Sequence, residues 1–447
     1  MRIAVVGAGI SGLGCAWLLN RQHEITVYEA AERLGGHSNT VDVAGPSGPV
    51  AVDTGFIVYN ELNYPNLTRL FDHLGVRTKR SIMSLGLSFD DGRLEYAGDT
   101  VAGLFAQRRN LLKPAFYGMV AEILRFYRQA PAVLTLPDAD SPTLGAYLHR
   151  HRYSRRFINQ HLLPMAAAIW SCPAEQMLEF PVTSFVRFCD NHGLLKVSDR
   201  PDWRTVDGGS REYVARLAAP FADRIRLGAP VQAIRRTGRG VEVTERSGLT
   251  QHFDQVVLAC HGDQAARMLV DASPSEAEII GSFRYQRNRA ILHRDPKLMP
   301  RRRRVWSSWN YLAREQANPS AASVSVTYWM NRLQSLGDAP DLFVSLNPID
   351  EPHPTLVERE FFYDHPVFDQ RAMAAQRRLP GLQGAGGVWF CGSYCGWGFH
   401  EDGFSAGLAV ARALGVEPPW RTAPAFAADA VWPLDGAPAL TAFEDAA

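Results

Sequence analysis

The sequence has little lysine, almost no net charge, no closely spaced cysteine pair and no long apolar run. Only four of its 47 basic residues are lysine, and the formal net charge is +1, so no global electrostatic field recruits nucleic acid. The six cysteines contain no CxxC pair, which indicates reduced thiols rather than a disulfide framework. No uncharged apolar stretch approaches the ~18 residues of a membrane span. A strand is expected from residue 2, so no signal peptide is predicted. These absences together favour a cytoplasmic protein.

What is present is concentrated in the turn Gly7-Ala8-Gly9-Ile10-Ser11-Gly12. An apolar strand is expected before it at 2–6, a helix after it at 13–19, and a second strand at 24–28 that ends at Glu29. Gly7 permits the tight turn, Gly9 lets the backbone approach a pyrophosphate, and Gly12 lets the helix pack on the strand. The phosphates would meet the free N–H groups at the helix start, around Ile10 and Ser11. Glu29 is an acceptor for ribose hydroxyls and would repel a 2′-phosphate, so the pattern predicts FAD or NAD rather than NADP.

A second group of small residues continues this site. Arg33, Gly35, Gly36 and His37 follow Glu29, and Thr54-Gly55-Phe56 follows another expected strand. This arrangement resembles the flavin-containing amine oxidase superfamily, which includes monoamine oxidases, protoporphyrinogen oxidases and carotenoid desaturases. The superfamily pattern is Glu, three residues, Arg, one residue, Gly-Gly-Arg. His37 stands where the superfamily usually has arginine, so the charge it could offer to a phosphate depends on pH.

Another glycine-rich stretch lies near residue 400. Gly392-Ser393 follows an expected buried strand, and Gly403-Phe404-Ser405 precedes a helix expected at 408–414. These positions resemble the superfamily's C-terminal flavin motif, although Ser393 replaces the usual glutamate. The resemblance implies that the helix N-terminus faces the flavin and that the backbone of Val231 holds the adenine. Two distant glycine-rich sites suit one extended cofactor, which selects FAD over NAD. No cysteine occupies the setting that some members use for covalent attachment, so the FAD is expected to be non-covalent.

The resemblance also implies a fold. We expect an α/β protein with a Rossmann-type FAD-binding domain built from 1–60, 205–262 and 381–420. An α+β substrate domain, formed by 61–204 and 263–380, is expected to be interleaved with it, as in the two-domain fold of amine oxidases. A chain of 447 residues has room for about two to three domains. The Pro- and Ala-rich stretch 421–447 is expected to be a tail.

Apolar and basic residues mark the expected substrate region. Residues 101–134 form a basic amphipathic stretch of helical type, which can pack on its own domain or lie on an anionic membrane surface. The run 162–170 is apolar and is expected to line a substrate pocket. The arginine run 301–304 is expected to be a solvated loop, or else to contact a phosphate or lipid headgroup. Nucleic acid is not predicted, because no recognition module accompanies that run. The region is compatible with a lipid substrate and with peripheral contact at the inner membrane face.

Flavin chemistry requires a C–H bond held at the flavin, a dry pocket and an acceptor for any released proton. The candidate acceptors are His400, Glu401, His261 and Lys196. His400 is favoured because the resemblance places it beside the ring and imidazole titrates near neutrality, although capping or packing is its alternative role. Lys196 could hold a water near the flavin, as a lysine does in several relatives. Phe399 stands where amine oxidases commonly place a substrate-facing tyrosine, and no acid is evidently aimed at an ammonium, which disfavours a small amine.

The whole-chain pattern, with its His-Glu-Asp-Gly ending, is similar to a bacterial branch of NAD/FAD-binding proteins. Some flavoproteins of that branch are associated with the desaturation of methyl-branched unsaturated fatty acyl chains. The first prediction is therefore an FAD-dependent desaturase of a long apolar, acyl substrate. The alternatives are an oxidase of a bulky amine, an FAD-dependent isomerase that moves a lipid double bond, and a non-catalytic flavin sensor of redox state. No metal site is predicted, and the exact substrate, the reoxidant and the oligomeric state stay open.

Overall fold

The fold is organised around a parallel sheet whose strands come from widely separated parts of the chain. The computed structural model describes residues 1–136, 141–170, 174–314 and 325–421. The strand order in this sheet is β10-β2-β1-β14-β20, and each neighbouring pair is parallel. The strands are β1 (Arg2–Val6), β2 (Glu24–Tyr28), β10 (Ile225–Arg226), β14 (Gln255–Leu258) and β20 (Val388–Phe390). β14, inside the sheet, and β20, at its edge, are both buried throughout, which is typical of a parallel sheet covered on both faces.

Two helices, α1 (Ile10–Leu19) and α14 (His400–Ala413), pack against each other beside this sheet. Their close approach depends on glycine. A Cβ on Gly407 would lie 2.3 Å from the carbonyl oxygen of Ser11, and a Cβ on Gly14 would lie 2.6 Å from the ring of Phe404. Within the glycine-rich turn, a Cβ on Gly12 would lie 1.8 Å from the carbonyl oxygen of Gly7. The helix pair and the turn therefore exclude any larger residue at these positions.

Helix α14 begins earlier than the sequence predicts. The expected start is residue 408, whereas the helix begins at His400. The Asp402 carboxylate accepts a hydrogen bond of 2.9 Å from the N–H of Phe399, which caps the first turn. Glu401 and Asp402 stand in that first turn, where the helix dipole favours acidic side chains. As a consequence, the glycine-rich stretch 403–407 lies within the helix rather than in a loop before it.

The described residues also form three smaller sheets. One is antiparallel and contains β11 (Val231–Thr237), β12 (Gly240–Glu245) and β13 (Thr250–Phe253). The second is the hairpin of β3 (Thr40–Gly45) and β4 (Gly48–Asp53). The third has the order β5-β9-β6 and contains β5 (Tyr59–Asn60), β9 (Trp203–Val206) and β6 (Thr78–Ser81).

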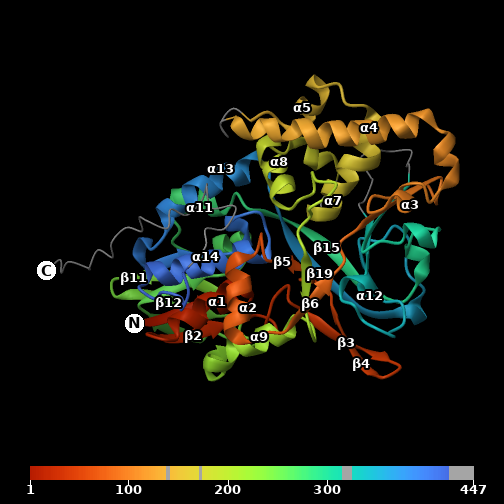
Figure 1. Cartoon of the computed structure of the whole chain (residues 1–447). Coiled ribbons are helices and arrows are strands. Elements are labelled where there is room, and N and C mark those ends of the chain that lie inside the picture. Colours follow the sequence, from red (N-terminus) through yellow and green to blue (C-terminus); the bar gives the residue numbers. More distant parts are fainter. Residues whose placement is uncertain (137–140, 171–173, 315–324, 422–447) are drawn as a thin grey trace.

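A seven-stranded sheet forms the other half of the molecule. Its order is β19-β15-β18-β17-β16-β7-β8. All neighbours in it are antiparallel except β16 and β7. The strands are β7 (Leu85–Phe89), β8 (Leu94–Ala97), β15 (Arg284–His293), β16 (Trp309–Ala313), β17 (Ser325–Trp329), β18 (Phe343–Leu346) and β19 (Val357–Val367). Strands β15 and β19 are long and reach from this sheet towards the parallel sheet (Figure 1).

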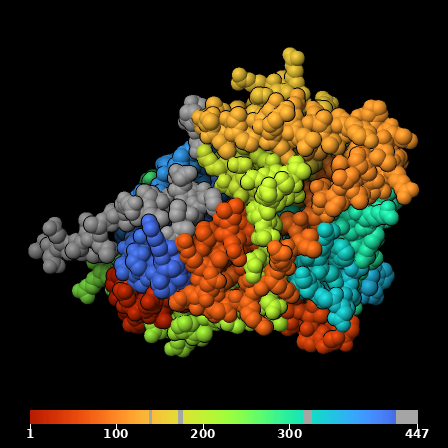
Figure 2. Space-filling view, in the orientation of Figure 1, coloured from red at the N-terminus to blue at the C-terminus, as the bar shows by residue number. Residues whose placement is uncertain are grey.

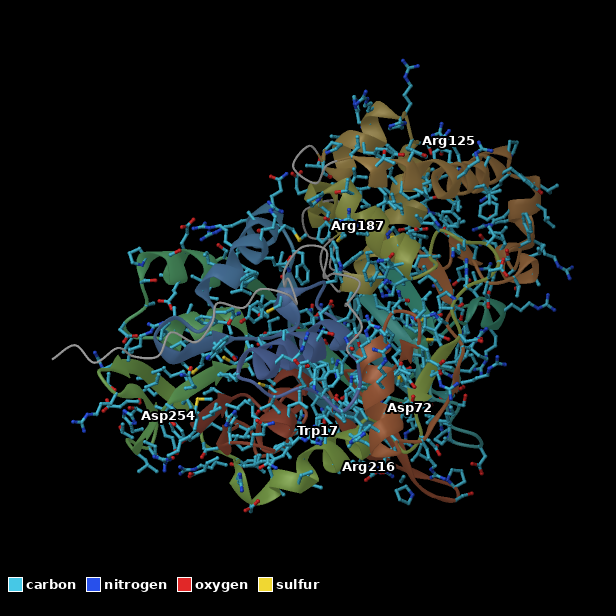
Figure 3. All side chains as sticks on the ribbon, turned by 60° about the vertical axis from the view of Figure 1, so that its left-hand side comes forward. Trp17, Asp72, Arg125, Arg187, Arg216 and Asp254 are labelled. Atoms are coloured by element: carbon cyan, nitrogen blue, oxygen red, sulfur yellow. The ribbon has the colours of Figure 1, made fainter. Side chains whose placement is uncertain are left out.

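A helical layer covers this half, and α4 runs across its outer side in Figures 1 and 2. The predicted amphipathic stretch is helical as expected, since α4 buries Phe116, Met119, Ile123 and Phe126 at helical spacing. Figure 3 places Arg125 on this outer layer, well away from Trp17 of α1. The layer contains α3 (Val101–Leu104), the 3₁₀ turns η1 (Arg108–Leu112) and η2 (Ala130–Thr135), α4 (Pro114–Gln129), α5 (Leu144–Arg150), α6 (Arg155–Phe157), the π-helical turn η4 (Ile158–Leu162), α7 (Leu163–Trp170) and α8 (Val182–Asn191).

The remaining α-helices are α2 (Pro65–Leu74), α9 (Arg211–Ala218), α10 (Gly262–Met268), α11 (Pro274–Ile280), α12 (Met330–Leu333) and α13 (Gln370–Arg378). All of them except α12 bury side chains in the core around the parallel sheet, whereas α12 packs with the seven-stranded sheet. Among the described residues, no helix is both long and apolar enough to cross a bilayer. The expected tail at 421–447 lies outside the described residues except for Arg421. The predicted division into FAD-binding and substrate domains stays a prediction.

Candidate active site

A single large cavity connects the glycine-rich turn after β1 with the underside of α4. Its volume is about 1120 Å³. Pockets for drug-sized ligands span roughly 300–1,000 Å³, so this cavity has space for more than one small ligand. Its lining comes from the turn region, from β11, β19 and the start of α14, and from the helical layer. The cavity therefore has two chemically different ends, which meet near His400.

The first end is built from backbone. Gly7, Gly9, Ile10 and Ser11 line it, and the N-terminus of α1 carries no side-chain cap, so its first N–H groups are free for a ligand. The space beside Gly9 is open, with no atom within 4 Å of where a Cβ would stand. A free helix N-terminus beside an open glycine is an anion-binding cradle, which fits the diphosphate of a dinucleotide.

Glu29 stands at the end of β2 and lines the same part of the cavity. Its Oε2 accepts a hydrogen bond from the N–H of Ala8 at 2.8 Å, and its Oε1 accepts one from the N–H of Ala31 at 2.9 Å. These bonds hold the carboxylate across the turn, with acceptor capacity left for a hydroxyl group. Val231, on β11, lines the cavity beside Arg246, at the place where the resemblance implies an adenine.

The segment after Glu29 closes over the turn. Gly35 and Gly36 adopt left-handed backbone angles, with φ of 100° and 57°. Residues Gly35, Gly36, His37, Thr54, Gly55 and Phe56 all line the cavity. His37 is half-buried, and its buried Nε2 has no hydrogen-bond partner among the described residues. Burial, followed by the charge that His365 would carry, holds the pKa of His37 well below its usual range. An unpartnered buried nitrogen at this position fits a bound polar group.

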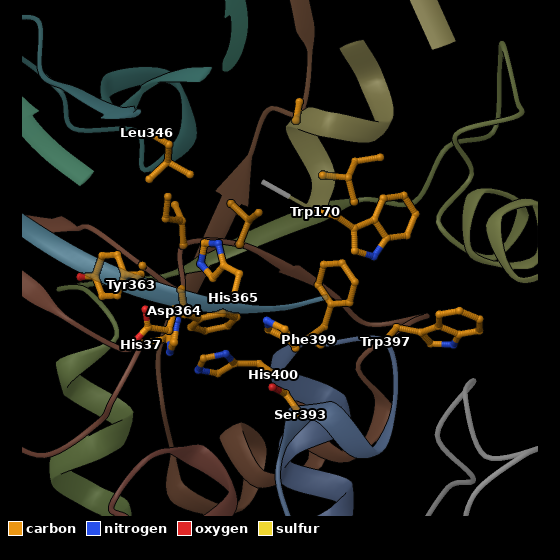
Figure 4. A pocket seen from close by; sticks show the side chains of 18 of the residues that line it. His37, Trp170, Leu346, Tyr363, Asp364, His365, Ser393, Trp397, Phe399 and His400 are labelled. Carbon is orange, nitrogen blue, oxygen red and sulfur yellow. The ribbon is translucent and has the colours of Figure 1, made fainter. Parts of the chain in front are cut away.

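The middle of the cavity is aromatic. The His37 ring lies 5.1 Å from Tyr363 and 5.4 Å from His365, between ring centroids. The Tyr363 hydroxyl accepts from the Nδ2 of Asn39 at 2.9 Å, and the Asn288 Nδ2 lies 2.9 Å from the Nδ1 of His365. In Figure 4, Tyr363, His365 and Asp364 gather near His37, whereas Phe399 lies between Trp170 and Trp397 on one side and His400 on the other. Gly392 and Ser393 line the cavity next to this group.

His400 is the first residue of α14 and faces this centre (Figure 4). Its ring stacks on Phe56, with centroids 3.7 Å apart and planes 12° from parallel. Its Nε2 is hydrogen-bonded to Ser38 Oγ at 2.9 Å and to the Tyr213 hydroxyl at 3.1 Å. Burial lowers the pKa of His400 to about 3, so the imidazole is neutral at neutral pH. The expectation of an imidazole titrating near neutrality is wrong at this position.

Two of the predicted catalytic residues do not line the cavity. The Glu401 carboxylate accepts hydrogen bonds from the N–H groups of Asn66 and Leu67, each 2.9 Å long, and so caps the start of α2. Lys196 is exposed and lies outside the cavity lining. The chain reverses at Gly193, with φ of 65°, and carries the Lys196 side chain into solvent. His261, the fourth candidate, lines the cavity and stacks on Tyr285, with centroids 4.3 Å apart.

Five predicted cofactor residues also lie outside the lining. The space beside Gly12 is occupied by the carbonyl group of Gly7, as described above. The Arg33 guanidinium donates to the carbonyl oxygens of Gly36 at 2.7 Å and Ser38 at 3.3 Å, so it holds the loop from behind. Gly403, Phe404 and Ser405 lie on α14, where they contact α1 and α2. These five residues therefore shape the cavity from outside its lining.

The other end of the cavity is apolar. Beyond Phe399 it runs between the seven-stranded sheet and the helical layer and reaches the surface beside α3 and α4. Val101, Leu124 and Val197 both line it and are exposed, at 76%, 51% and 73%, so its mouth is apolar. We call this part the apolar arm. Its inner lining is Met83, Leu85, Leu87, Leu104, Val120, Ile123, Met165, Ala168, Ile169, Trp170, Phe188, Leu194 and Leu346. Of the predicted apolar run 162–170, Met165, Ala168, Ile169 and Trp170 line the cavity.

Several lining residues were missed from the sequence. Tyr363 and His365 share a face of β19, because alternate residues of a strand point the same way, and that spacing was the available signal. Asp364 also lines the cavity and supplies a carboxylate near its centre, where the sequence predicted none. Tyr127, His161 and Arg200 line the apolar arm. No local sequence pattern predicts that these three residues line the cavity, because they come from separate elements. Within the described ranges, no cluster of His, Cys, Asp and Glu has the arrangement of a metal site.

Comparison with known protein families gives a match over most of the chain. Residues 10–295 match the model of the family described as flavin containing amine oxidoreductase. A protein of Mycobacterium tuberculosis that bears the name flavin-containing monoamine oxidase AofH is 27% identical over 261 residues, which are 55% of this chain and 54% of that protein. The chain thus spans about half the length of the curated relatives it matches.

Solved structures resemble about nine tenths of the chain. The cyclohexylamine oxidase of Brevibacterium oxydans IH-35A superposes with a TM-score of 0.65 at 17% identity, covering 92% of this chain and 99% of that one. The CLA-producing fatty acid isomerase from P. acnes superposes with a TM-score of 0.57 at 15% identity, covering 91% of this chain and 96% of that one. At these identities the likeness concerns the fold, and it confirms the expected α/β architecture of amine-oxidase type.

Proposed function

The chain belongs to the flavin-containing amine oxidoreductase family, and from this premise we propose that it oxidises a C–H bond of a long apolar substrate. Its cofactor is FAD, as family membership and the dinucleotide cradle at Gly9 agree. We take the reaction to be the desaturation of an unsaturated fatty acyl chain, methyl-branched chains included. We further propose that the FAD is held without a covalent bond, by the turn, Glu29, the 35–37 loop and the residues around Ser393.

The observation that carries this proposal is the apolar arm. It joins the aromatic centre to an opening lined by Val101, Leu124 and Val197, all exposed. Exposed apolar side chains around a pocket mouth are costly in water unless they serve a ligand or a surface. A long hydrocarbon chain entering there would bury them and at the same time exclude water from the centre. The same mouth could touch a membrane from which such a lipid is taken.

The charge state of the cavity supports an apolar substrate. Burial lowers the pKa of His365, His161 and His192 to about 4 and that of His400 to about 3. These rings are therefore neutral at pH 7 and can line an apolar chain without a charge to solvate. The Asp99 carboxylate lines the cavity but is paired with Arg332 at 3.0 Å.

The chain's own residues have separable roles in such a reaction. When bound, FAD supplies the hydride acceptor. Phe56, Ser38 and Tyr213 fix the His400 ring by stacking and by two hydrogen bonds to Nε2. We propose that neutral His400 takes the proton that leaves the substrate carbon, although a pKa of about 3 makes its imidazole a weak base at neutral pH. Trp170, Phe399 and the arm around them keep water away from that proton.

A second candidate is favoured by Asp364. Its carboxylate lines the centre of the cavity near His37 (Figure 4) and could pair with an ammonium group, as a bulky-amine oxidase would require. The name of the M. tuberculosis relative agrees with that activity. An isomerase that moves a lipid double bond is a variant of the first proposal, favoured by the fatty acid isomerase among the structural neighbours.

Anaerobic titration of the purified yellow protein tests these proposals. An unsaturated fatty acid should bleach the flavin absorbance, and mass spectrometry should find a product two hydrogens lighter. Turnover without any electron acceptor, with no mass change, would indicate the isomerase instead. Bleaching by bulky amines alone, with peroxide release in air, would indicate the amine oxidase. If neither lipids nor amines reduce the flavin, the proposed oxidoreductase activity is refuted and the non-catalytic redox sensor is the alternative that stays.

A further inference from the structure

Arg200 is a cation in the apolar arm, and none of the described acids pairs with it. Its Nε donates to the carbonyl oxygen of Lys196 at 2.8 Å, which orients the guanidinium. Neither Nη1 nor Nη2 has a hydrogen bond to any other described residue. The residue lines the cavity and is exposed, as is the nearby Val197 at the mouth. A guanidinium with two open nitrogens beside a ligand cavity is arranged to meet an anion from outside the protein.

A hydroxyl group stands beside this cation. Tyr127, on α4, lines the same arm, and the positive charge of Arg200 opposes the effect of burial, which raises the Tyr127 pKa to about 12. The phenol therefore stays protonated and can donate a hydrogen bond. The only hydrogen-bond partner of this hydroxyl among the described residues is the Nε2 of His161, at 3.4 Å, which is long for a hydrogen bond.

The neighbouring histidine is held as an acceptor. The Tyr96 hydroxyl donates to the carbonyl oxygen of Gln160 at 2.7 Å, so the Tyr96 oxygen accepts from the Nδ1–H of His161 at 3.2 Å. This assignment leaves Nε2 of His161 without a proton. The ring therefore adds no second positive charge. Its Nε2 accepts from the Tyr127 hydroxyl only across 3.4 Å, so a charged carboxylate can compete for that proton.

We propose that Arg200 and Tyr127 bind the carboxylate of a free fatty acid at the mouth of the apolar arm, with the hydrocarbon chain directed inward towards His400. This inference rests on the proposed lipid function and adds to it that the substrate is the free acid, not an esterified acyl chain. A carboxylate matches the fork of one guanidinium and accepts a further bond from a phenol. It stays near water at the exposed Arg200, while the chain lies against buried residues such as Ile123, Met165 and Trp170.

Binding measurements on the FAD-loaded protein, after removal of co-purified lipid, test this site. Oleate and oleyl alcohol differ only at the headgroup, and calorimetry gives the Kd of each. We expect wild-type protein to bind oleate about tenfold or more tightly than oleyl alcohol, as for a charge-assisted pair. Arg200→Gln should remove that preference and leave the Kd for oleyl alcohol within about twofold. Tyr127→Phe should weaken oleate binding by about fivefold, since one neutral donor is lost.

Lys196→Gln is the matched control. It removes a positive charge four residues away on the same loop, at a side chain outside the cavity lining, and should leave both Kd values unchanged. Arg200→Lys keeps the charge but not the fork, and we expect it to recover part of the preference. If Arg200→Gln fails to fold, the Tyr127→Phe and Arg200→Lys values decide the same question.

The outcomes separate the two proposals. Equal affinity of wild-type protein for oleate and oleyl alcohol, or equal loss of both in Arg200→Gln, would overturn the carboxylate site and leave the lipid function standing. Equally tight binding of 1-oleoyl-lysophosphatidylcholine would also overturn it, because that lipid has no free carboxylate. Binding of none of the three would overturn both proposals.

Discussion

The two ends of the cavity are built by different means. The cradle end uses backbone N–H groups, glycines and one carboxylate, all contributed by short segments that follow one another in the chain. The apolar arm uses side chains from strands, helices and a loop that lie far apart in the sequence. Backbone geometry tolerates little change, whereas a side-chain lining can be altered one residue at a time. The comparison suggests that cofactor binding is fixed by the fold and substrate choice is not.

The largest expected effect comes from Gly12→Val. A Cβ at Gly12 would lie 1.8 Å from the Gly7 carbonyl oxygen, inside the turn itself. We expect a loss of stability of about 3 kcal/mol or more, because backbone would have to move. Urea unfolding of the variant measures it. A stable, flavin-loaded Gly12→Val protein would contradict this account of the turn.

Gly9→Val, in the same turn, should affect FAD binding rather than stability. The space beside Gly9 is open, so the protein should fold with near-normal stability. The added side chain would occupy the cradle, and we expect FAD affinity to fall about 100-fold, or roughly 2.7 kcal/mol. Flavin content and thermal unfolding, measured on the same sample, distinguish this loss of binding from unfolding.

The pH dependence of stability probes the neutral lining of the arm. Burial lowers the pKa of His161 from an unfolded value near 6.5 to about 4. Below pH 6.5 the unfolded chain therefore binds more protons than the folded chain. The contribution of neutral His161 to the free energy of unfolding is complete above that pH and is lost as the pH falls towards 4. Between pH 7 and pH 5 the difference is up to about 2 kcal/mol. His161→Gln should flatten the stability curve by that amount, whereas His149→Gln, an exposed residue on α5, should not.

Ile169→Trp changes the arm alone. Ile169 lines the arm and is only partly buried by protein, so a larger side chain can extend into the cavity. We expect fatty acid binding to weaken by about tenfold, roughly 1.4 kcal/mol, while flavin content is unchanged. Loss of flavin together with lipid binding would show that the two ends are not separable.

The smallest effect is expected at Gly118, which lies within α4 on its exposed side with nothing within 4 Å of a Cβ. Gly118→Ala should stabilise the protein by about 0.5–1 kcal/mol, because alanine lowers the entropic cost of helix formation. Flavin content and lipid affinity should stay at wild-type values. A change in either would indicate that α4 moves when the ligand enters.

The cradle could be predicted from sequence because its parts are local. Strand, turn, helix and Glu29 follow in order, and Gly7, Gly9 and Glu29 line the cavity as expected. The start of α14 could not be read in the same way. The capping residue Asp402 lies inside a glycine-rich motif that is typical of a loop, so the predicted helix leaves out residues 400–407.

Glu401, predicted as a catalytic residue, lies only one position away from a residue that does line the cavity. It is the neighbour of His400, but successive residues of a helix point about 100° apart, so one faces the cavity and the other faces α2. The arm was predictable only as an apolar region. The meeting of Tyr127, His161 and Arg200 depends on how α4, η4 and the loop after α8 pack, and sequence spacing carries no record of that.

Helix α14 joins the two ends mechanically. It presents His400 at its first residue, and two turns later Gly407 is pressed against Ser11 of the cradle. A shift of the nucleotide-holding turn therefore cannot occur without displacing the imidazole. Filling of the cradle should thus be detectable as a change in the nuclear magnetic resonance signal of His400, even before any substrate is added.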